Sequence, residues 1–328
     1  MFTKFFTVRL HQNYENQEVT TKPDLQGGSY IKNCYFHDIR GDSASSIIST
    51  SANQGSVPDL NIENCYFNKV VTESYYTIYA EGVSVLLFNC FLECKTTATD
   101  TKSTSIFYNR YEKKSRFESN SVMKSDEGNY LIFAMKAEFK QNNFTSNQPK
   151  LCAVNYNKFD TKITSSFFVN TAPTDSTALY LQSFSEIELA IFYNNPGTGL
   201  SLKDSTITIK NCTFIRNTQN DIFLDTSTAT ISFCQFSNMK VNDPEKITKD
   251  NTNFLEGSGV PSNMIPNLSN GAQIGQNKYF CFNTQFEGES YEPNTPTPNS
   301  DCEPDVQERL KYKRIKYIFA LGSAAQSI

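Results

Sequence analysis

The chain has 328 residues and a formal net charge of −4, from 30 basic and 34 acidic residues. This balance provides no global basic field, so no nucleic-acid partner is expected. Trp is absent and His occurs twice, whereas 26 Phe and 17 Tyr residues favour strands over helices. The nine cysteines include no Cys-x-x-Cys pair, so neither a metal site nor a cofactor is predicted.

Residues 1–30 carry no clear repeat motif and are predicted to be an N-terminal cap. Met1–Gln12 lacks the continuous apolar run that is typical of a signal peptide. The sequence contains no stretch of about 20 apolar residues, so no complete membrane span is predicted. A cap is expected because the open end of a stacked sheet invites pairing with another chain.

A short motif recurs through residues 31–240. The segments 31–36, 62–67 and 209–214 are near copies of Ile-Lys-Asn-Cys-Tyr-Phe, and the final apolar residues of all the repeats fall at 36, 67, 92, 122, 144, 168, 192, 214 and 236. The chain has too few leucines for leucine-rich repeats, which share this period. The sequence therefore predicts an all-β fold, a right-handed parallel β-helix of about nine coils with 22–31 residues each.

Side-chain parity divides the motif into a strand, a corner and a second strand. Cys and Phe are two residues apart and share one face, whereas the first Ile has the opposite parity. The corner is assigned to an asparagine, which tolerates the left-handed backbone region: Asn33, Asn64, Asn89 and Asn211. The predicted inward stacks are Cys34, Cys65, Cys90, Cys212 and Cys234, together with Phe36, Phe67, Phe144, Phe168, Phe192, Phe214 and Phe236. A third strand precedes each motif, as in the alternation around Leu200 and Leu202.

The cysteines have two interpretations. They could form disulfides between coils, or they could be buried small apolar residues, which is the favoured interpretation. The β-carbons of stacked cysteines would lie about 4.8 Å apart, which is farther than the roughly 3.8 Å between the β-carbons of a typical disulfide. Cys281 and Cys302 lie outside the repeat and could pair with each other in a secreted protein.

The C-terminal part carries no repeat. Residues 241–285 are predicted to be a second cap or an irregular segment, and residues 286–328 a disordered tail. This tail begins as a linker rich in Pro and Asn and ends in a basic run from Arg309 to Lys316 with a short apolar stretch. The run is either a juxtamembrane segment that associates with a membrane or a frayed basic tail.

Phe-x-x-Asn closes coils at Phe144–Asn147, Phe192–Asn195 and Phe214–Asn217. This pattern resembles the repeat of chlamydial polymorphic outer-membrane proteins, although their Gly-Gly-Ala-aliphatic repeat is missing. The Asn-Cys-x-Phe form is similar to that of related surface proteins in trichomonad parasites, and the fold resembles the pectin-lyase-like superfamily. The resemblance covers about two-thirds of the chain and implies a β-helix, which can serve as an enzyme or as a stalk.

No catalytic residue is predicted. The motifs of β-helix polysaccharide hydrolases are absent from the coils, and no paired acids are recognised at matching register in neighbouring coils. The acids Asp126, Glu127, Asp204, Asp221 and Asp225 are interpreted as turn residues, and His37 as an exposed one. A pectin-lyase-like lyase or hydrolase therefore remains the alternative, and enzymatic activity is left open.

The preferred hypothesis is a non-catalytic surface or extracellular protein that binds glycans or cell-surface proteins, with a cytoplasmic scaffold as the alternative location. Tyr75, Tyr76, Tyr79, Tyr108 and Tyr111 are candidate contacts, although some of them could pack inward. Two sequons make Asn143 and Asn267 candidate glycosylation acceptors, as expected for a glycoprotein. A third sequon begins at the predicted corner residue Asn211.

Overall fold

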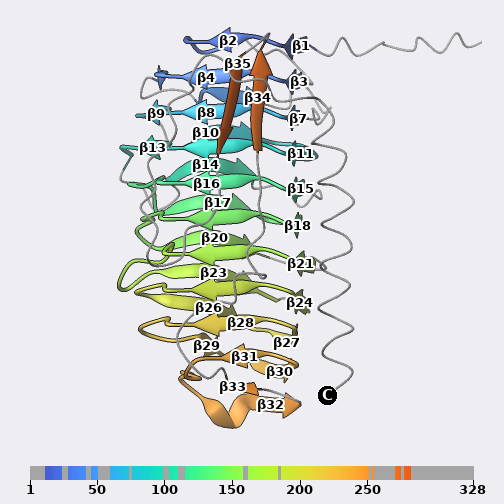
Figure 1. Ribbon diagram of the computed structural model, residues 1–328, viewed down its shortest axis with the longest axis vertical. Helices are drawn as coiled ribbons and strands as arrows, with labels where there is room; N and C mark the ends of the chain where they lie inside the picture. The colour runs from blue at the N-terminus through green and yellow to red at the C-terminus, as the bar shows by residue number, and fades with distance from the viewer. Residues whose placement is uncertain are drawn as a thin grey trace, which may run out of the picture.

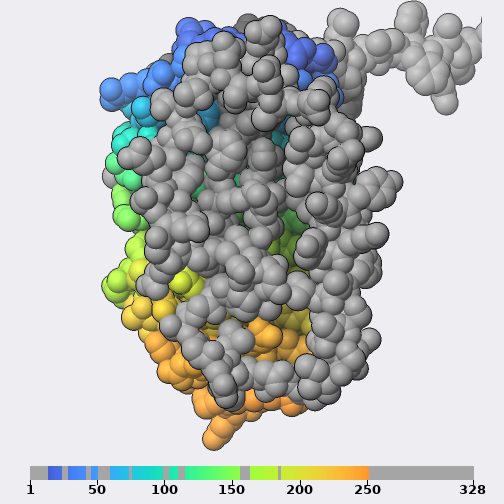
Figure 2. Space-filling model, in the orientation of Figure 1, coloured from blue at the N-terminus to red at the C-terminus, as the bar shows by residue number. Residues whose placement is uncertain are grey.

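The computed structural model describes residues 12–23, 29–41, 46–50, 60–73, 76–98, 103–109, 115–157, 162–183, 186–250, 253–254, 270–274 and 277–281. The chain is a right-handed parallel β-helix, as the repeat predicted (Figure 1). The coils stack in chain order along a rod (Figure 2). The predicted tail, residues 286–328, lies outside the described residues.

Three long parallel sheets form the walls of the rod. The first, here the Ile sheet, consists of β1 (Gln12–Glu15), β3 (Ser29–Lys32), β7 (Leu60–Glu63), β11 (Ser84–Leu87), β15 (Ser115–Glu118), β18 (Ala137–Lys140), β21 (Lys162–Thr164), β24 (Glu186–Glu188), β27 (Thr206–Lys210), β30 (Thr228–Ser232) and β32 (Ile247–Asp250). The second, the Phe sheet, consists of β2 (Glu18–Val19), β4 (Tyr35–His37), β8 (Tyr66–Asn68), β12 (Cys90–Leu92), β16 (Ser121–Met123), β19 (Asn143–Thr145), β22 (Phe167–Val169), β25 (Ile191–Tyr193), β28 (Thr213–Ile215), β31 (Gln235–Phe236) and β33 (Asn253–Phe254).

The third wall, the Tyr sheet, consists of β6 (Ile48–Thr50), β10 (Tyr76–Ala80), β14 (Thr104–Asn109), β17 (Tyr130–Ala134), β20 (Cys152–Asn157), β23 (Thr177–Gln182), β26 (Thr198–Lys203) and β29 (Ile222–Asp225). The short strands β5 (Arg40–Gly41), β9 (Val71–Thr72) and β13 (Lys95–Thr96) form a small fourth sheet, and η1 (Pro244–Lys246) is a 3₁₀ turn. Each full coil therefore runs from the Tyr sheet to the Ile sheet and then to the Phe sheet.

The stacking extends beyond both ends of the predicted solenoid. In the described residues, the Ile and Phe sheets hold eleven strands each, where about nine coils were predicted. Strands β1 and β2 lie in the predicted cap but pair in parallel with β3 and β4. At the other end, β32 and β33 pair with β30 and β31. These end coils lack the Cys-x-Phe signature, so the motif could not reveal them.

Stacked phenylalanines fill the core beneath the Phe sheet. Phe144, Phe168, Phe192, Phe214 and Phe236 are fully buried, and successive ring centroids lie 4.8–5.2 Å apart with nearly parallel planes. Such rings contribute a large area of apolar burial together with specific ring contacts. One parallel register therefore places identical side chains above one another through much of the rod.

The third coil departs from the predicted register by one residue. Phe91, and not Leu92, pairs with Phe67, and their ring centroids lie 4.8 Å apart. The corner residue with positive φ is accordingly Phe88, at 57°, whereas Asn33, Asn64 and Asn211 occupy the equivalent corners at 50–51°. The assignment of Asn89 as a corner is therefore wrong. The apolar residues on both sides of Asn89-Cys90 allowed either alignment of the sequence.

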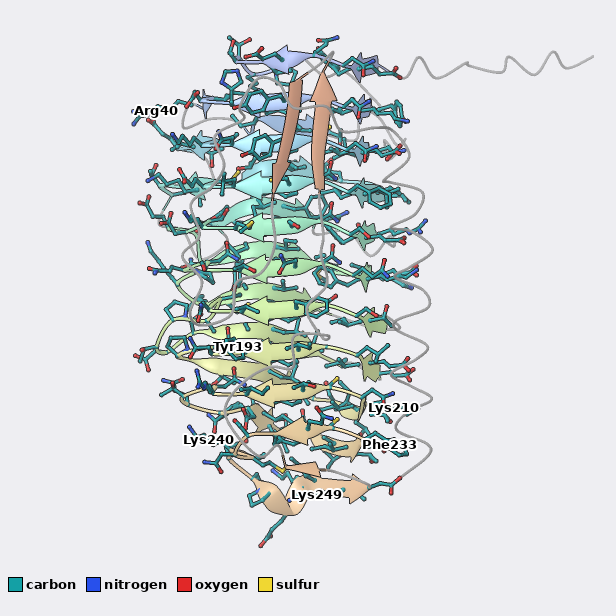
Figure 3. The ribbon with its side chains drawn as sticks, viewed as in Figure 1. Arg40, Tyr193, Lys210, Phe233, Lys240 and Lys249 are labelled. Carbon is teal, nitrogen blue, oxygen red and sulfur yellow. The ribbon has the colours of Figure 1, made fainter. Side chains whose placement is uncertain are left out.

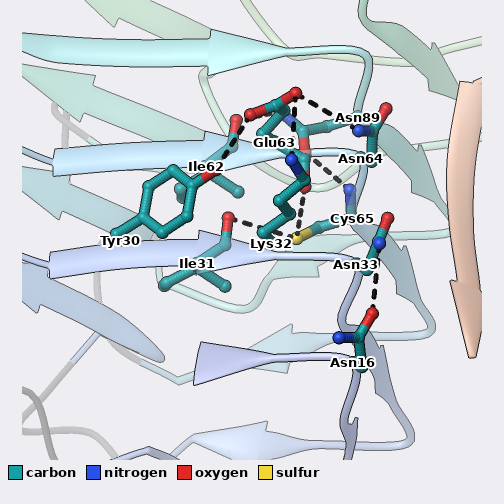
Figure 4. Close-up of polar contacts among 10 residues, drawn as sticks. All are labelled: Asn16, Tyr30, Ile31, Lys32, Asn33, Ile62, Glu63, Asn64, Cys65 and Asn89. Atoms are coloured by element: carbon teal, nitrogen blue, oxygen red, sulfur yellow. Dashed lines mark hydrogen bonds and ion pairs between the residues drawn. The ribbon is translucent and has the colours of Figure 1, made fainter. Parts of the chain in front are cut away.

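The residue after this corner points into the rod and forms one column, which is polar except at Ala190. Its members are Cys34, Cys65, Asn89, Asn120, Asn142, Ser166, Ala190, Cys212 and Cys234. Most of them donate to the carbonyl two residues earlier, as the Cys65 thiol does to Glu63 at 3.3 Å and the Ser166 hydroxyl to Thr164 at 3.1 Å. Cys65 N–H also donates to Asn89 Oδ1 of the next coil at 2.9 Å (Figure 4). Apart from Ala190, each position of the column therefore carries a side chain that can donate, which is Cys, Asn or Ser.

Cys90 does not belong to this column. It pairs with Tyr66 on the outward side of the Phe sheet, because the register is shifted by one residue. Cys90 is disulfide-bonded, whereas Cys34, Cys65, Cys94, Cys152, Cys212 and Cys234 are free and buried. The free thiols match the interpretation of the cysteines as buried small apolar residues, whereas the disulfide at Cys90 does not. The side chains of Cys281 and Cys302 lie outside the described residues.

A second inward ladder follows the Phe column. Asn195 Nδ2 donates to Asn217 Oδ1 at 2.9 Å and to the Phe168 carbonyl at 3.0 Å. Asn147 continues the ladder toward the N-terminus through Thr171 at 3.1 Å. The side chains of the polar column and of this second ladder are thus hydrogen-bonded from coil to coil, as buried polar groups require.

A hairpin packs across the outside of the rod. Strands β34 (Asn270–Ile274) and β35 (Asn277–Cys281) pair antiparallel and contact β8 and β12. They run along the rod axis, nearly perpendicular to the strands beneath them (Figure 1). This part of the Phe sheet is therefore not an open face.

Candidate functional site

The outer face of the Ile sheet is charged. Lys140 pairs with Glu118 at 3.4 Å and Lys210 with Glu186 at 3.5 Å. Lys210 and Phe233 lie at the same edge of the rod (Figure 3). Exposed ion pairs contribute little stability and are screened by salt, so this face is a solvated surface.

The outer face of the Phe sheet is apolar and buried. One cluster consists of Tyr35, Tyr66, Cys90, Leu92 and Met123, and a second consists of Phe167, Val169, Ile191, Tyr193 and Ile215. Each member is at most 8% exposed. Neither cluster therefore offers a solvent-facing ligand surface.

The outer face of the Tyr sheet carries an uncharged column with one side chain per coil. We call this set the aromatic column: Tyr79, Tyr108, Phe133, Asn155, Tyr180, Ser201 and Phe223, paired in successive coils. Tyr108, Asn155 and Ser201 are buried, whereas Tyr79, Phe133 and Tyr180 are partly exposed and Phe223 is exposed. The preceding residue in each strand points inward, as Leu179 and Ile222 do with no exposure. This alternation is what a strand with one buried face requires.

Ring contacts hold the N-terminal half of the aromatic column together. The centroids of Tyr79 and Tyr108 lie 6.1 Å apart and those of Tyr108 and Phe133 lie 5.0 Å apart, with interplanar angles of 14° and 17°. A register shift between β10 and β14 accompanies the approach of Tyr76 to 4.2 Å from Tyr108. Since the rings stack on one another, their edges are what the column turns toward a ligand.

The structure brings together part of the predicted tyrosine set. Tyr76, Tyr79 and Tyr108 form one cluster, whereas Tyr75 and Tyr111 lie outside the described residues. The sequence reasoning missed Phe133, Tyr180 and Phe223. Their shared parity with Tyr79 and Tyr108, outward next to an inward aliphatic residue, was the signal that could have found them.

Two carboxylates lie near Tyr180, Asp204 at a corner and Asp225 at the end of β29. Asp204 accepts from Thr226 Oγ1 at 2.5 Å and from Gln182 Nε2 at 3.3 Å, while Lys203 pairs with Asp225 at 3.9 Å. Asp204 N–H donates to the Asp225 carbonyl of the next coil. Burial, and then the charges of Asp225 and Asp204, raise the pKa of Tyr180.

Asp204 and Asp225 come from neighbouring coils, but they do not stand at matching register. Lys203, and not Asp204, is in register with Asp225, while Asp204 occupies the left-handed corner at φ 48°. Strict spacing therefore hid the pair. Of the other predicted turn acids, Asp126 pairs with Lys95 and Gln148 in isolated bridges, and burial raises its pKa.

Asp221 is a buried acid that ends the second interior ladder. It is 1% exposed, and it accepts from Asn217 Nδ2 at 2.8 Å and from Lys240 N–H at 2.9 Å. Burial raises its pKa to about 6, although these hydrogen bonds and the Lys240 charge oppose the shift. Lys240 lies toward the C-terminal end of the rod (Figure 3).

Asp221 should give the fold a measurable pH dependence. Because the pKa of Asp221 is higher in the folded state than in the unfolded state, protonation of its carboxyl stabilises the fold. This stabilisation is fully present below the unfolded pKa and is lost as the pH rises through about 6. The free energy of unfolding of wild type minus that of Asp221→Asn should increase by about 2 kcal/mol between about pH 7.5 and about pH 4.5. Urea titrations at the two pH values measure this difference. The exposed Asp225→Asn is the control, and an equal difference at both pH values would contradict the assignment.

Two other predicted positions differ from expectation. His37 is held between Glu18 at 2.6 Å and Asp38 at 3.0 Å, stacks on Tyr35 and is 18% exposed, so it is not a simple exposed turn residue. Asn143 is fully buried, so its sequon is closed in the folded chain. The sequon at Asn211 starts at an exposed residue, and Asn267 lies outside the described residues.

The described residues contain no group of three or more His, Cys, Asp or Glu side chains that could hold a metal ion. Within the same residues, no helix has the length and apolar character needed to cross a membrane.

Comparisons with known proteins concern the fold. No family model and no curated protein matches the chain. The periplasmic alginate epimerase AlgG is similar at 11% identity and a TM-score of 0.47, over 73% of this chain and 64% of that one. Full-length QnrB1, a plasmid-mediated fluoroquinolone resistance protein, is similar at 8% identity and a TM-score of 0.26, over 75% of this chain and 92% of that one.

Proposed function

We propose that this chain is a non-catalytic surface or extracellular β-helix protein that binds glycans through the aromatic column. The observation that carries the proposal is an uncharged line of Tyr, Phe, Asn and Ser side chains across seven paired strands of one sheet. Aromatic side chains provide apolar contact area together with hydroxyls that order a polar ligand. The neighbouring walls, which are charged or apolar and buried, lack this combination.

The location is part of the proposal. A disulfide at Cys90 suits an oxidising compartment, as on a cell surface or outside the cell. Membrane association through the basic run at 309–316 remains a proposal from the sequence. Antibody labelling of unpermeabilised cells tests the location, and signal restricted to permeabilised cells would favour the cytoplasmic alternative.

Binding should depend on the aromatic column. The double variant Tyr79→Ala with Tyr180→Ala should lose at least about tenfold in affinity on a glycan array, because two partly exposed rungs lose their contact area and hydroxyls. The matched control is Thr208→Ala with Thr230→Ala on the Ile sheet, which should bind as wild type does. The fold of each variant is checked by far-UV circular dichroism. Equal binding by the tyrosine variant and the wild type would contradict the proposal.

A pectin-lyase-like polysaccharide lyase or hydrolase is the second candidate. It is favoured by Asp204 and Asp225, which come from neighbouring coils beside Lys203. Hydrolases of glycosidic bonds use two carboxylates on opposite sides of the bond. Release of reducing ends from a bound polysaccharide, abolished in Asp204→Asn and in Asp225→Asn, would establish this function in place of simple binding.

A further inference from the structure

We propose that the outer face of the Phe sheet is the docking surface of the chain's own C-terminal segment, and that a disulfide between Cys90 and Cys281 fastens this segment to the rod. The segment, here called the strap, comprises residues 255–281 and includes the β34–β35 hairpin. This inference concerns a different face from the proposed glycan site and does not depend on it.

The partner of Cys90 is one of two cysteines. The chain has nine cysteines, and the free ones are Cys34, Cys65, Cys94, Cys152, Cys212 and Cys234. Because Cys90 is disulfide-bonded, its partner is Cys281 or Cys302, and both follow the coils in sequence. Strand β35 ends at Cys281 and contacts β12, which begins at Cys90. The backbone therefore favours Cys281, and this pairing replaces the bond between Cys281 and Cys302 that the sequence allowed.

The hairpin lies over the first apolar cluster of the Phe sheet. Tyr66 belongs to β8, and Cys90 and Leu92 belong to β12, which are the two strands that the hairpin contacts. These side chains are on the outer face of the sheet, yet none of the three is more than 6% exposed. This burial is reached within one chain, so it requires no second copy. A disulfide at Cys90 would hold the hairpin at the strand where the cluster needs cover.

Chain length directs the first part of the strap over the second apolar cluster. Strand β33 ends at Phe254 in the last coil, and β34 begins at Asn270 in the hairpin that contacts β12 (Figure 1). Seven strand spacings of the Phe sheet, about 34 Å, separate β33 from β12. Residues 255–269 can span about 50 Å when extended, which leaves little length for a detour over another wall. The shortest route crosses β28, β25 and β22, the strands that carry the second cluster.

The composition of residues 255–269 suits an apolar surface. The second cluster lies on an outer face, but each of its members is at most 8% exposed, so it is already covered within the chain. The segment has one charged residue, Glu256, and two prolines, which have no backbone N–H to leave unpaired. Its apolar side chains are Leu255, Val260, Met264, Ile265 and Leu268. We therefore assign this segment as the occupant of the second cluster.

Peptide mapping of the full chain without reduction tests the disulfide. The thiols are first blocked under denaturing conditions, and the protein is then digested with trypsin and a glutamyl endopeptidase. The second enzyme is needed because Glu93 separates Cys90 from Cys94 and Glu287 separates Cys281 from Cys302. We expect a linked peptide pair containing Cys90 and Cys281, which is lost in Cys281→Ser and kept in the control Cys302→Ser. A link from Cys90 to Cys302, or a blocked Cys90 thiol in the wild type, would overturn the fastening.

Thiol labelling tests the occupant of the second cluster. Ile215→Cys places a thiol on β28 at a position with no exposure, and a maleimide reports its accessibility, with the labelled peptide identified by mass. Adding Met264→Asp with Ile265→Asp should raise the labelling rate at residue 215 by at least about tenfold, because charged side chains undock the strap. The control Val306→Asp lies outside the strap and should leave the rate unchanged.

Circular dichroism shows whether each variant keeps the β-helix. An unchanged labelling rate in the folded strap variant would overturn the assignment of residues 255–269. A labelling rate that rises when the protein without strap substitutions is diluted would show that a second copy covers the cluster, and would overturn the assignment as well.

Discussion

Replacing Phe168 by alanine is expected to lower the free energy of unfolding by about 4 kcal/mol. The Phe168 ring is fully buried between Phe144 at 5.2 Å and Phe192 at 5.1 Å. Alanine would leave a cavity that its neighbours cannot fill, because the strands above and below fix their positions. Chemical denaturation followed by circular dichroism measures the loss.

A graded series makes this prediction specific. Phe168→Leu keeps most of the volume and should cost about 1.5 kcal/mol. Phe233→Asn is the control, because Phe233 is 44% exposed at a corner with φ 54°, where asparagine is better tolerated. It should cost nothing and could gain up to about 1 kcal/mol. A loss below about 1 kcal/mol for Phe168→Ala would mean that the Phe column does not support the core.

Asn120→Ala is expected to lower the free energy of unfolding by about 3 kcal/mol. Asn120 Oδ1 accepts from Asn89 N–H at 3.1 Å and from Asn89 Nδ2 at 3.0 Å. Its Nδ2 donates to the Leu86 carbonyl at 2.9 Å and to Asn142 Oδ1 at 3.0 Å. Alanine leaves these buried groups without their hydrogen bonds to residue 120, at a site that is 3% exposed.

Serine occurs naturally in this column at Ser166, so Asn120→Ser should recover part of the loss. The matched control is Asn238→Ala at an exposed asparagine, with an expected change within about 0.5 kcal/mol. The same denaturation experiment compares the three variants. If Asn120→Ala were no worse than Asn238→Ala, the interior ladder would contribute no stability.

The sequence predicted the fold well because coil stacking repeats its pattern. Ile62 and Phe67 show parity and spacing that few architectures share, and both are fully buried. The ends were harder to predict. Strands β2 and β33 have two residues each, and their coils do not repeat the motif. Backbone pairing to a neighbouring coil, which leaves little trace in composition, holds them in the stack.

The shifted third coil shows a limit of motif alignment. Leu86 to Leu92 is apolar at almost every position, so either parity gives a plausible inward face. The structure selects the register that places Asn89 inward, where its side chain bonds Asn120 and the Ile62 carbonyl. A hydrogen-bond partner 31 residues away decided the register, and a local motif contains no information about it.

The candidate site was predicted in part. Tyr76, Tyr79 and Tyr108 stood out as tyrosines, but which of them share a face depends on a bulge between β10 and β14. The acids at 204 and 225 are 21 residues apart, one short of the local coil length, because one lies at a corner and the other on a strand. Sites built from different coil positions need the structure to bring them together.

The crystal structure of the full chain with a glycan selected on the array tests the central claim most directly. The account predicts ligand density on the outer face of the Tyr sheet, in contact with the partly exposed rings of Phe133 and Tyr180. Ligand density on the outer face of the Ile sheet or of the Phe sheet would contradict it.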